Sequence, residues 1–238
     1  MQLNFTRRSF FVSGANQGIG MHTVHQIALN PGVVVFMGSR RLEAAEAAIA
    51  SFDPPIHASS SVVPVQLDVT DEASVRAAAK LVQTTLEQRN IAGLDVLINN
   101  AGVLFGTLAA VYAVNFSGAV SLTDALRPFI NRGGVIINIS STMGSIGTLL
   151  ADDVWAILVP YNTSKSAMNA LTVNWAIKER REGTGVRVVS ICPGSVKTST
   201  NPQGERHPAD ACRIIVKTAM ESEGRTGVFF DKDGDIPW

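Results

Sequence analysis

Short apolar runs rich in valine and isoleucine recur along the chain, and segments of helical periodicity lie between them. The runs predict seven strands, at 10–12, 33–36, 62–67, 94–98, 134–139, 186–191 and 227–230. The segments between them predict helices at about 18–30, 41–51, 71–90, 108–131, 161–182 and 208–222. Because the runs are mostly continuous and do not alternate with polar residues, they are typical of strands buried on both faces. The pattern therefore predicts an α/β fold of the Rossmann type, with a doubly wound, seven-stranded parallel sheet.

The alternation of strands and helices continues through all 238 residues, so we expect a single domain spanning 1–238. Two irregular stretches interrupt it, at 51–61 and at about 144–160. The alternation resumes after each of them, so both are interpreted as loops within the domain and not as linkers.

Composition narrows the choice of partners. The chain has 20 basic and 20 acidic residues, so neither nucleic acid nor an acidic membrane is an expected partner. No apolar run approaches the length of a membrane span. Cys192 and Cys212 do not have the spacing of a metal site and are interpreted as small buried thiols, which fits a reducing, cytoplasmic location. His22 and His25 lie one helical turn apart without an evident third ligand, so we expect no metal.

A glycine-rich turn joins the first predicted strand to the helix that follows it. Glycines let the backbone turn tightly and approach a pyrophosphate, which binds at the positive end of a helix. A glycine turn alone is weak evidence, but its place between a strand and a helix predicts a dinucleotide site. The residues of this predicted site are Gly14, Asn16, Gln17, Gly18, Ile19 and Gly20.

The end of the second strand bears on which dinucleotide binds. An acidic residue there would bind the ribose hydroxyls of NAD, whereas an arginine would pair with the 2′-phosphate of NADP. Here Ser39 and Arg40 occupy the place, and no acidic residue occurs before Glu43. These two side chains favour NADP (NADPH) over NAD, because arginine can form a bidentate contact with phosphate. The alternative is that Arg40 and Arg41 only cap a solvated turn.

A tyrosine and a lysine suggest the chemistry. Tyr161 and Lys165 lie four residues apart on a predicted helix, and therefore on one face of it. A phenol titrates near pH ~10, and an adjacent ammonium is expected to lower its pKa. Such a pair can act as a general acid and base on a carbonyl or an alcohol.

These segments and several others occur in an order that resembles the short-chain dehydrogenase/reductase family, and more narrowly its carbonyl-reductase-like branch. The resemblance covers nearly the whole chain. It rests on Gly14-x-x-x-Gly18-Ile-Gly20, Leu67-Asp68-Val69, Asn99-Asn100-Ala101-Gly102, Ser141, Tyr161-x-x-x-Lys165 and Pro193-Gly194-x-Val196-x-Thr198.

The resemblance implies a set of cofactor contacts beyond the glycine turn. Asp68 and Val69 would border the adenine ring, and Lys165 would hold the nicotinamide ribose beside Tyr161. The remaining residues would line the dinucleotide at the carboxyl ends of the strands: Asn99, Ala101, Gly102, Pro193, Gly194, Val196 and Thr198.

The resemblance also implies a reaction, the NADP-dependent interconversion of a small or medium ketone or aldehyde and its alcohol. Ser141 would hydrogen-bond the substrate oxygen, and Tyr161 would exchange a proton with it. Lys165 would assist Tyr161, and Asn115 would hold a water molecule in a proton relay. Ser140 is an alternative to Ser141. A homodimer or homotetramer, packed through the helices near 108–131 and 161–182, is expected.

The chain departs from the family pattern in several places. The stretch from Gly102 to Asn115 is short, whereas the stretch from Ser141 to Tyr161 is long. Within the long stretch, residues Trp155, Ile157 and Leu158 could wall an apolar pocket or pack against a second subunit. The short segment 199–206 predicts an open site.

Two other functions remain open at this point. One is a regulatory protein that senses NADP without catalysis, although it would not need the tyrosine and lysine pair. The other is an epimerase or dehydratase of the same fold acting on a nucleotide sugar. That group usually has a larger carboxyl-terminal region than this chain.

Overall fold

The computed structural model describes residues 8–151 and 158–238 of the chain. All strand pairs of its sheet are parallel, and the strand order is β3-β2-β1-β4-β5-β6-β7. The doubly wound, seven-stranded parallel sheet predicted from the sequence is thereby confirmed. The strands are β1 (Arg8–Val12), β2 (Val33–Ser39), β3 (Ser61–Gln66), β4 (Leu94–Asn99), β5 (Ile130–Ile139), β6 (Arg187–Ile191) and β7 (Val228–Phe230).

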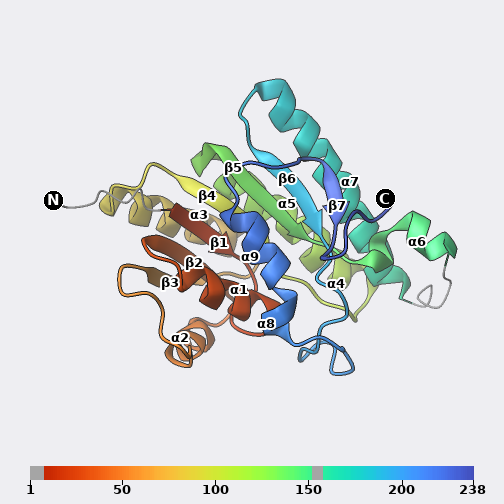
Figure 1. Ribbon diagram of the computed structural model, residues 1–238, viewed down its shortest axis with the longest axis horizontal. Coiled ribbons are helices and arrows are strands. Elements are labelled where there is room, and N and C mark those ends of the chain that lie inside the picture. The colour runs from red at the N-terminus through yellow and green to blue at the C-terminus, as the bar shows by residue number, and fades with distance from the viewer. Residues whose placement is uncertain (1–7, 152–157) are drawn as a thin grey trace.

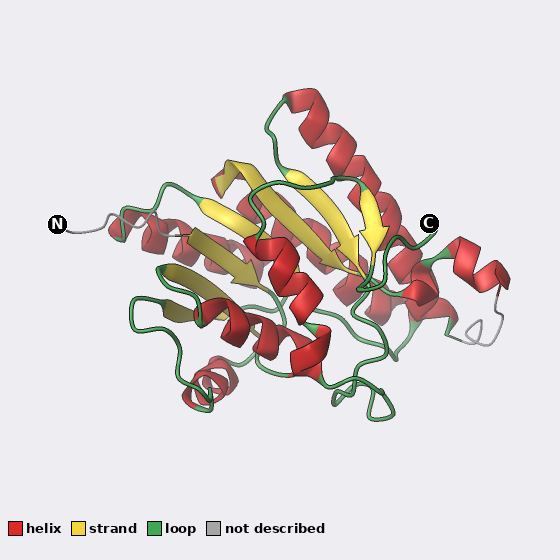
Figure 2. Cartoon of the chain, in the orientation of Figure 1, coloured by secondary structure: helices red, strands yellow, loops and turns green. Residues whose placement is uncertain are grey.

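Helices cover both faces of the sheet (Figures 1 and 2). One face packs against α1 (Gly18–Ala28), α2 (Leu42–Ala50) and α9 (Arg213–Met220), and the short α8 (Pro208–Ala211) packs on α1 and α9. The other packs against α3 (Glu72–Gln88), α5 (Gly118–Leu126) and α7 (Val159–Glu182). Within the described residues, no helix is long and apolar enough to cross a membrane.

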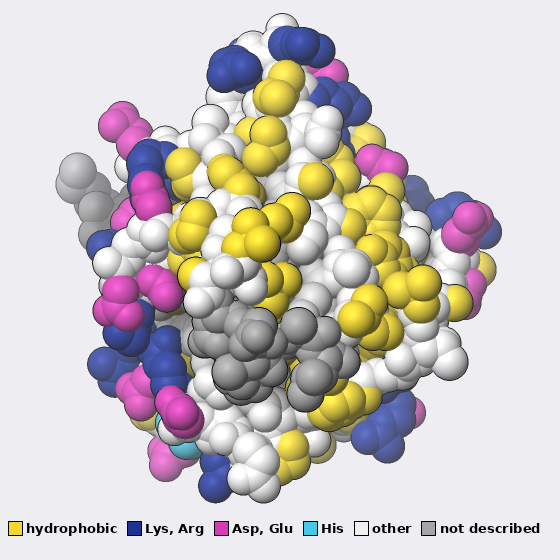
Figure 3. Space-filling model, turned by 90° about the vertical axis from the view of Figure 1, so that its right-hand side faces the viewer, with side chains coloured by type: hydrophobic (Ala, Val, Ile, Leu, Met, Phe, Trp, Pro, Cys, Tyr) yellow, Lys and Arg dark blue, Asp and Glu magenta, His cyan; other side chains and the backbone are white. Residues whose placement is uncertain are grey.

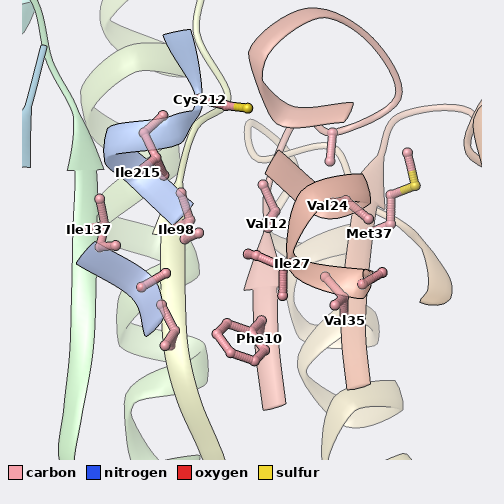
Figure 4. Close-up of a cluster of buried hydrophobic side chains, with 14 of the residues drawn as sticks. Phe10, Val12, Val24, Ile27, Val35, Met37, Ile98, Ile137, Cys212 and Ile215 are labelled. Atoms are coloured by element: carbon pink, nitrogen blue, oxygen red, sulfur yellow. The ribbon is translucent and has the colours of Figure 1, made fainter. Parts of the chain in front are cut away.

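The core on the first face shows how the apolar pattern is used (Figure 4). Successive strand residues point to opposite faces, so Phe10 and Val12 lie on this side and Phe11 on the other. Val24 of α1 and Ile215 of α9 are fully buried against the strands. Both cysteines are buried and free, as expected, and Cys212 belongs to this cluster.

The predicted helix at 108–131 is the largest departure from expectation. The structure divides it into α4 (Leu108–Tyr112), a π-helical turn (Ala113–Ser117), α5 and a 3₁₀ turn (Arg127–Phe129). The 3₁₀ turn contains Pro128, which cannot continue an α-helix because it lacks an N–H. The strand that follows begins at Ile130, which pairs with Leu94 ahead of an irregularity in the register.

Smaller differences lie elsewhere. The expected helix at 208–222 divides at Cys212 into α8 and α9. The stretch expected to be irregular contains a 3₁₀ turn (Thr142–Gly144) and α6 (Ile146–Ala151), and α7 begins before Tyr161, at Val159. Residues Trp155 and Ile157, proposed as pocket walls, lie outside the described residues.

A row of buried polar side chains crosses the interior and ties α5 and α7 to the sheet. Asn99 Nδ2 on β4 donates to Thr123 Oγ1 of α5 and to Asn138 Oδ1 of β5, both at 2.9 Å. Asn138 Nδ2 donates to Thr172 Oγ1 of α7 at 2.8 Å, and that hydroxyl bonds with Ser190 Oγ of β6 at 2.8 Å. Because these groups are shielded from water, each depends on its neighbours for hydrogen bonds.

Asn138 therefore offers a test of this polar row. Replacing it with alanine removes one buried hydrogen bond from Asn99 and one from Thr172, so Asn138→Ala should lower the free energy of unfolding by about 2 kcal/mol or more. Asn174 on α7 is exposed and bonds only to its own helix, so Asn174→Ala should change stability by less than about 0.5 kcal/mol. Urea unfolding of both variants measures the difference. Equal stability losses would mean that the row contributes nothing specific.

Candidate active site

The glycine turn predicted from the sequence lies against the ends of neighbouring strands. Gly14 has φ of 60° and Gly18 has φ of 55°, a left-handed conformation that glycine adopts without strain. A Cβ on Gly14 would lie 2.8 Å from the Cα of Ala101, and one on Gly18 would lie 3.2 Å from Thr198 Cγ2. The absence of side chains thus lets the turn approach both of these segments closely.

Ser13 and Asn100 join the carboxyl ends of β1 and β4 by hydrogen bonds. Ser13 Oγ accepts from the backbone N–H groups of Asn100 and Ala101, both at 3.0 Å. In return, Asn100 Nδ2 donates to the carbonyl oxygens of Ser13 at 2.8 Å and of Gly14 at 3.0 Å. These contacts fix the glycine turn in place. Asn100 was not among the residues predicted for the site, although it directly follows Asn99, which was.

A cavity of about 630 Å³ extends from the glycine turn along the carboxyl ends of the strands. Most of the residues predicted for the site line this cavity. They are Gly14, Asn16, Gln17, Gly18, Ile19, Gly20, Arg40, Asp68, Val69, Ala101, Gly102, Ser141, Tyr161, Lys165, Pro193, Gly194, Val196 and Thr198.

Three predicted residues, Ser39, Asn99 and Asn115, are not part of the cavity lining. Ser39 is buried, and its Oγ bonds with the backbone of Arg41, donating to the carbonyl oxygen at 2.9 Å. Asn99 belongs to the buried polar row described above. The amide of Asn115 is occupied by the backbone of Val103 and by Ser164 Oγ.

Asn115 nevertheless sits close to the catalytic candidates. It is fully buried in the π-helical turn that separates α4 from α5. A Cβ placed on Gly102 would lie 3.4 Å from Asn115 Oδ1 and 3.6 Å from Lys165 Nζ, so both groups approach the same point of the backbone. Single π-helical turns within helices are frequent at functional sites. Asn115 therefore holds the loop beside Lys165, and the water relay implied by the resemblance stays a prediction.

Asp68 and Arg40 lie at the end of the cavity bordered by β2 and β3. Hydrogen bonds from Thr70 Oγ1 at 2.7 Å and from Thr70 N–H at 2.9 Å are the main causes that lower the pKa of Asp68. The charge of the exposed Arg40 lowers the same pKa further. Arg40 is thus near enough to interact with Asp68 while its side chain remains open to solvent.

The structure distinguishes the two serine candidates by their partners. Ser140 Oγ is buried and donates to Asn169 Oδ1 at 2.6 Å. Ser141 is half-buried, its Oγ accepts from the N–H of Met143 at 3.2 Å, and its hydroxyl lies close enough to that of Tyr161 to lower the tyrosine pKa. The turn after Ser141 packs directly on α7, because a Cβ on Gly144 would lie 2.6 Å from Lys165 Cβ. Ser141 is therefore the serine whose hydroxyl is paired with Tyr161.

Lys165 lies beside Tyr161, but the net pKa of the tyrosine is raised and not lowered as expected. Its Nζ donates to the carbonyl oxygen of Ile139 at 2.8 Å and lies over the Tyr161 ring, 5.6 Å from the ring centre. Burial raises the pKa of Tyr161 to about 12, and the hydrogen bond with Ser141 opposes that rise. Burial also lowers the pKa of Lys165 to about 8. Desolvation outweighs the attraction between charges in this pair.

The cavity also contains residues to which the sequence analysis gave no role. Cys192 is buried in the lining, and burial raises the pKa of its thiol. The short segment after Thr198 folds back through a bridge between Val196 and Arg206. Leu158, proposed as either a pocket wall or a subunit contact, lines the cavity. The other unassigned lining residues include Thr70, Asn100, Val103, Leu104, Val114, Thr142, Met143, Asn201 and Glu205.

Comparisons with known proteins agree with this geometry. The family model described as short chain dehydrogenase matches residues 8–208. The chain is 28% identical over 236 residues to the short-chain dehydrogenase anuI of Penicillium roqueforti, covering 91% of this chain and 90% of the relative. It is 25% identical over 219 residues to the NADP-dependent 3-hydroxy acid dehydrogenase of Schizosaccharomyces pombe, covering 85% and 78%. The NADPH-bound carbonyl reductase from chicken fatty liver superposes with a TM-score of 0.77 and 28% identity, covering 98% and 100%.

The lowered pKa of Lys165 predicts a pH dependence of stability. Between the folded pKa of about 8 and the ordinary value of 10.5, the unfolded chain binds this proton and the folded chain does not. The contribution of Lys165 to stability therefore rises with pH in this window, with a slope of about 1 kcal/mol per pH unit. The raised pKa values of Cys192 and Cys212 oppose this trend above their ordinary value of 9.0, and that of Tyr161 opposes it above 10.0. The contribution of Lys165 is therefore measured between pH 8 and 10 as a difference from a variant that lacks it.

Lys165→Met removes this contribution and keeps an apolar stem of similar length. The free energy of unfolding of the natural protein minus that of the variant should rise from pH 8 to pH 10. Chemical unfolding at several pH values measures it. A difference that stays constant across this range would show that Lys165 keeps its ordinary pKa in the folded protein.

Proposed function

Because the chain belongs to the short-chain dehydrogenase/reductase family, we propose that it is an NADP-dependent oxidoreductase. It interconverts a ketone or aldehyde and the corresponding alcohol. The proposal rests on one observation: Ser141, Tyr161 and Lys165 line the same cavity as the glycine turn. A carbonyl reductase needs the cofactor site and the proton-donating side chains within one cavity.

The cavity fits a dinucleotide on structural grounds. Gly14 and Gly18 leave room for close approach of a pyrophosphate; Gly14 precedes α1, and Gly18 is the first residue at its positive end. Arg40, exposed beside Asp68, would bind the 2′-phosphate of NADP, and Asp68 would border the adenine. The bound NADPH of the chicken carbonyl reductase and the name of the yeast relative also support NADP.

The side chains of this protein have distinct tasks in the proposed reaction. A bound reduced nicotinamide supplies the hydride that adds to the carbonyl carbon. Ser141 Oγ donates a hydrogen bond to the carbonyl oxygen, and Tyr161 Oη gives its proton to the same oxygen. With a pKa of about 12, Tyr161 is protonated at neutral pH and so carries the proton that the carbonyl oxygen would receive. Lys165, with a pKa of about 8, is mostly charged at pH 7 and would stabilise the phenolate that remains.

The experiment that tests the function follows reduced-nicotinamide absorbance while a panel of ketones and aldehydes is supplied with NADPH. The proposal predicts carbonyl-dependent loss of absorbance. A protein that only senses NADP would bind the cofactor, which quenching of protein fluorescence detects, and would reduce none of the carbonyls.

Tyr161→Phe tests the assignment of the acid. Loss of the hydroxyl should lower kcat by at least about 10²-fold, while the dissociation constant for NADPH changes little, because the ring remains. The chain has one other tyrosine, Tyr112, which is half-buried on α4 and outside the cavity lining. Tyr112→Phe is therefore the matched control and should keep kcat. An undiminished kcat in Tyr161→Phe would remove Tyr161 as the acid.

Arg40→Asp tests the choice of cofactor. A carboxylate at this place would repel the 2′-phosphate and accept hydrogen bonds from the ribose hydroxyls of NADH. The ratio of kcat/KM for NADPH to that for NADH should fall at least about tenfold. Arg41→Asp is the control, since Arg41 is the exposed neighbour outside the cavity lining. If both variants leave the ratio unchanged, Arg40 does not recognise the phosphate.

A further inference from the structure

We propose that the substrate is an uncharged carbonyl compound with an apolar body, and that the site discriminates against carboxylates. This inference rests on the proposed function and names the substrate class of the same site. It follows from the distribution of charged and apolar side chains around the cavity.

The charged residues among the described lining residues are Arg40, Asp68, Lys165 and Glu205. Arg40 and Asp68 interact with each other at the end bordered by β2 and β3, where the adenosine would bind. Lys165 is buried, and its Nζ is already bound to the carbonyl oxygen of Ile139. Within the described lining, therefore, no free cation lies next to Ser141 and Tyr161 to pair with a substrate carboxylate.

Glu205 and Arg206, at the end of the short segment 199–206, also bear on whether the site accepts a carboxylate. Arg206 is the arginine of this segment, but its guanidinium donates to the carbonyl oxygens of Pro193 at 2.7 Å and Asp210 at 3.3 Å. Its neighbour Glu205 is exposed and lines the cavity. This segment therefore adds a negative charge to the cavity lining, whereas carbonyl oxygens hold the guanidinium of Arg206 outside the lining. A negative charge in the lining disfavours an anionic substrate.

Apolar side chains form the walls near the proposed catalytic groups. Val103, Leu104 and Val114 come from the segment between β4 and α5, and Met143 and Leu158 come from the stretch between β5 and α7. All five are half-buried, so each still presents apolar surface to be covered. A substrate with an apolar body would cover this surface and gain affinity by doing so.

The apolar character continues outside the cavity lining. Phe105 and Leu108 follow Leu104 along the chain, and 68% and 57% of their surfaces are exposed. Val159 follows Leu158, and 56% of its surface is exposed. Figure 3 views the molecule from the side on which α6 and α7 lie in Figure 1, and it shows hydrophobic side chains gathered on that face. Large apolar residues are usually covered, so this concentration beside a cavity indicates a binding surface. These residues lie along the chain beside Leu104 and Leu158, which line the cavity with Ser141 and Tyr161, and this favours the substrate as the occupant.

The test compares acetoacetate with its methyl and butyl esters as substrates, with NADPH and the whole chain at pH 7. The three compounds share one ketone and differ in charge and apolar length. The kcat/KM for the methyl ester should exceed that for acetoacetate at least about tenfold. The butyl ester should exceed the methyl ester by about tenfold or more, since each fully buried methylene contributes about fourfold.

A pair of variants makes the test independent of the reactivity of the compounds. Leu104→Lys adds a cation to the apolar wall, whereas Leu81→Lys makes the same change on α3, where Leu81 is 41% exposed. Leu104→Lys should lower the ratio of kcat/KM for the butyl ester to that for acetoacetate at least about tenfold. Leu81→Lys should leave the ratio unchanged. Binding of NADPH to both variants, followed by fluorescence, shows that the cofactor site is intact.

The outcomes separate this inference from the function on which it rests. Acetoacetate turned over as fast as its esters, or an unchanged ratio in Leu104→Lys, would overturn the substrate class while leaving the reductase intact. Reduction of none of these compounds or of the wider carbonyl panel, with NADPH still bound, would instead refute the proposed function and the inference with it.

Discussion

The junction of β1 and β4 is the constraint on which the rest of the structure depends. The strand order places these two strands side by side, and the chain leaves them in opposite directions, which opens a crevice at their carboxyl ends. Ser13 and Asn100 close the junction with hydrogen bonds in both directions. Gly14 lets the turn lie against Ala101, where any side chain would collide. The crevice is therefore formed by the backbone, before any catalytic side chain contributes.

The catalytic candidates are fixed to the same sheet by a second set of contacts. Ser141 follows β5, and the turn after it packs on α7 at Lys165. The buried row through Asn138 and Thr172 ties α7 to β5 from within. Lys165 is buried and Tyr161 half-buried, and the loss of water keeps the phenol protonated and weakens the affinity of the amine for its proton. Burial thus keeps a proton on Tyr161, although it also makes the phenol a weaker acid.

Backbone-determined features could be predicted from the sequence, and features set by tertiary contacts could not. The strands and the glycine turn follow from apolar runs and residue type, and both were found. Asn99 and Asn100 are adjacent and chemically equal, and only their surroundings place one in the polar row and the other at the turn. The raised pKa of Tyr161 depends on burial, which a spacing of four residues does not report.

A crystal structure of the protein bound to NADPH tests the central claim, that one cavity joins the glycine turn to the tyrosine and lysine pair. We expect the 2′-phosphate beside Arg40 and the nicotinamide ring beside Tyr161 and Pro193, with the pyrophosphate at Gly18. A dinucleotide bound elsewhere, or one whose nicotinamide lies out of reach of the Tyr161 hydroxyl, would contradict it.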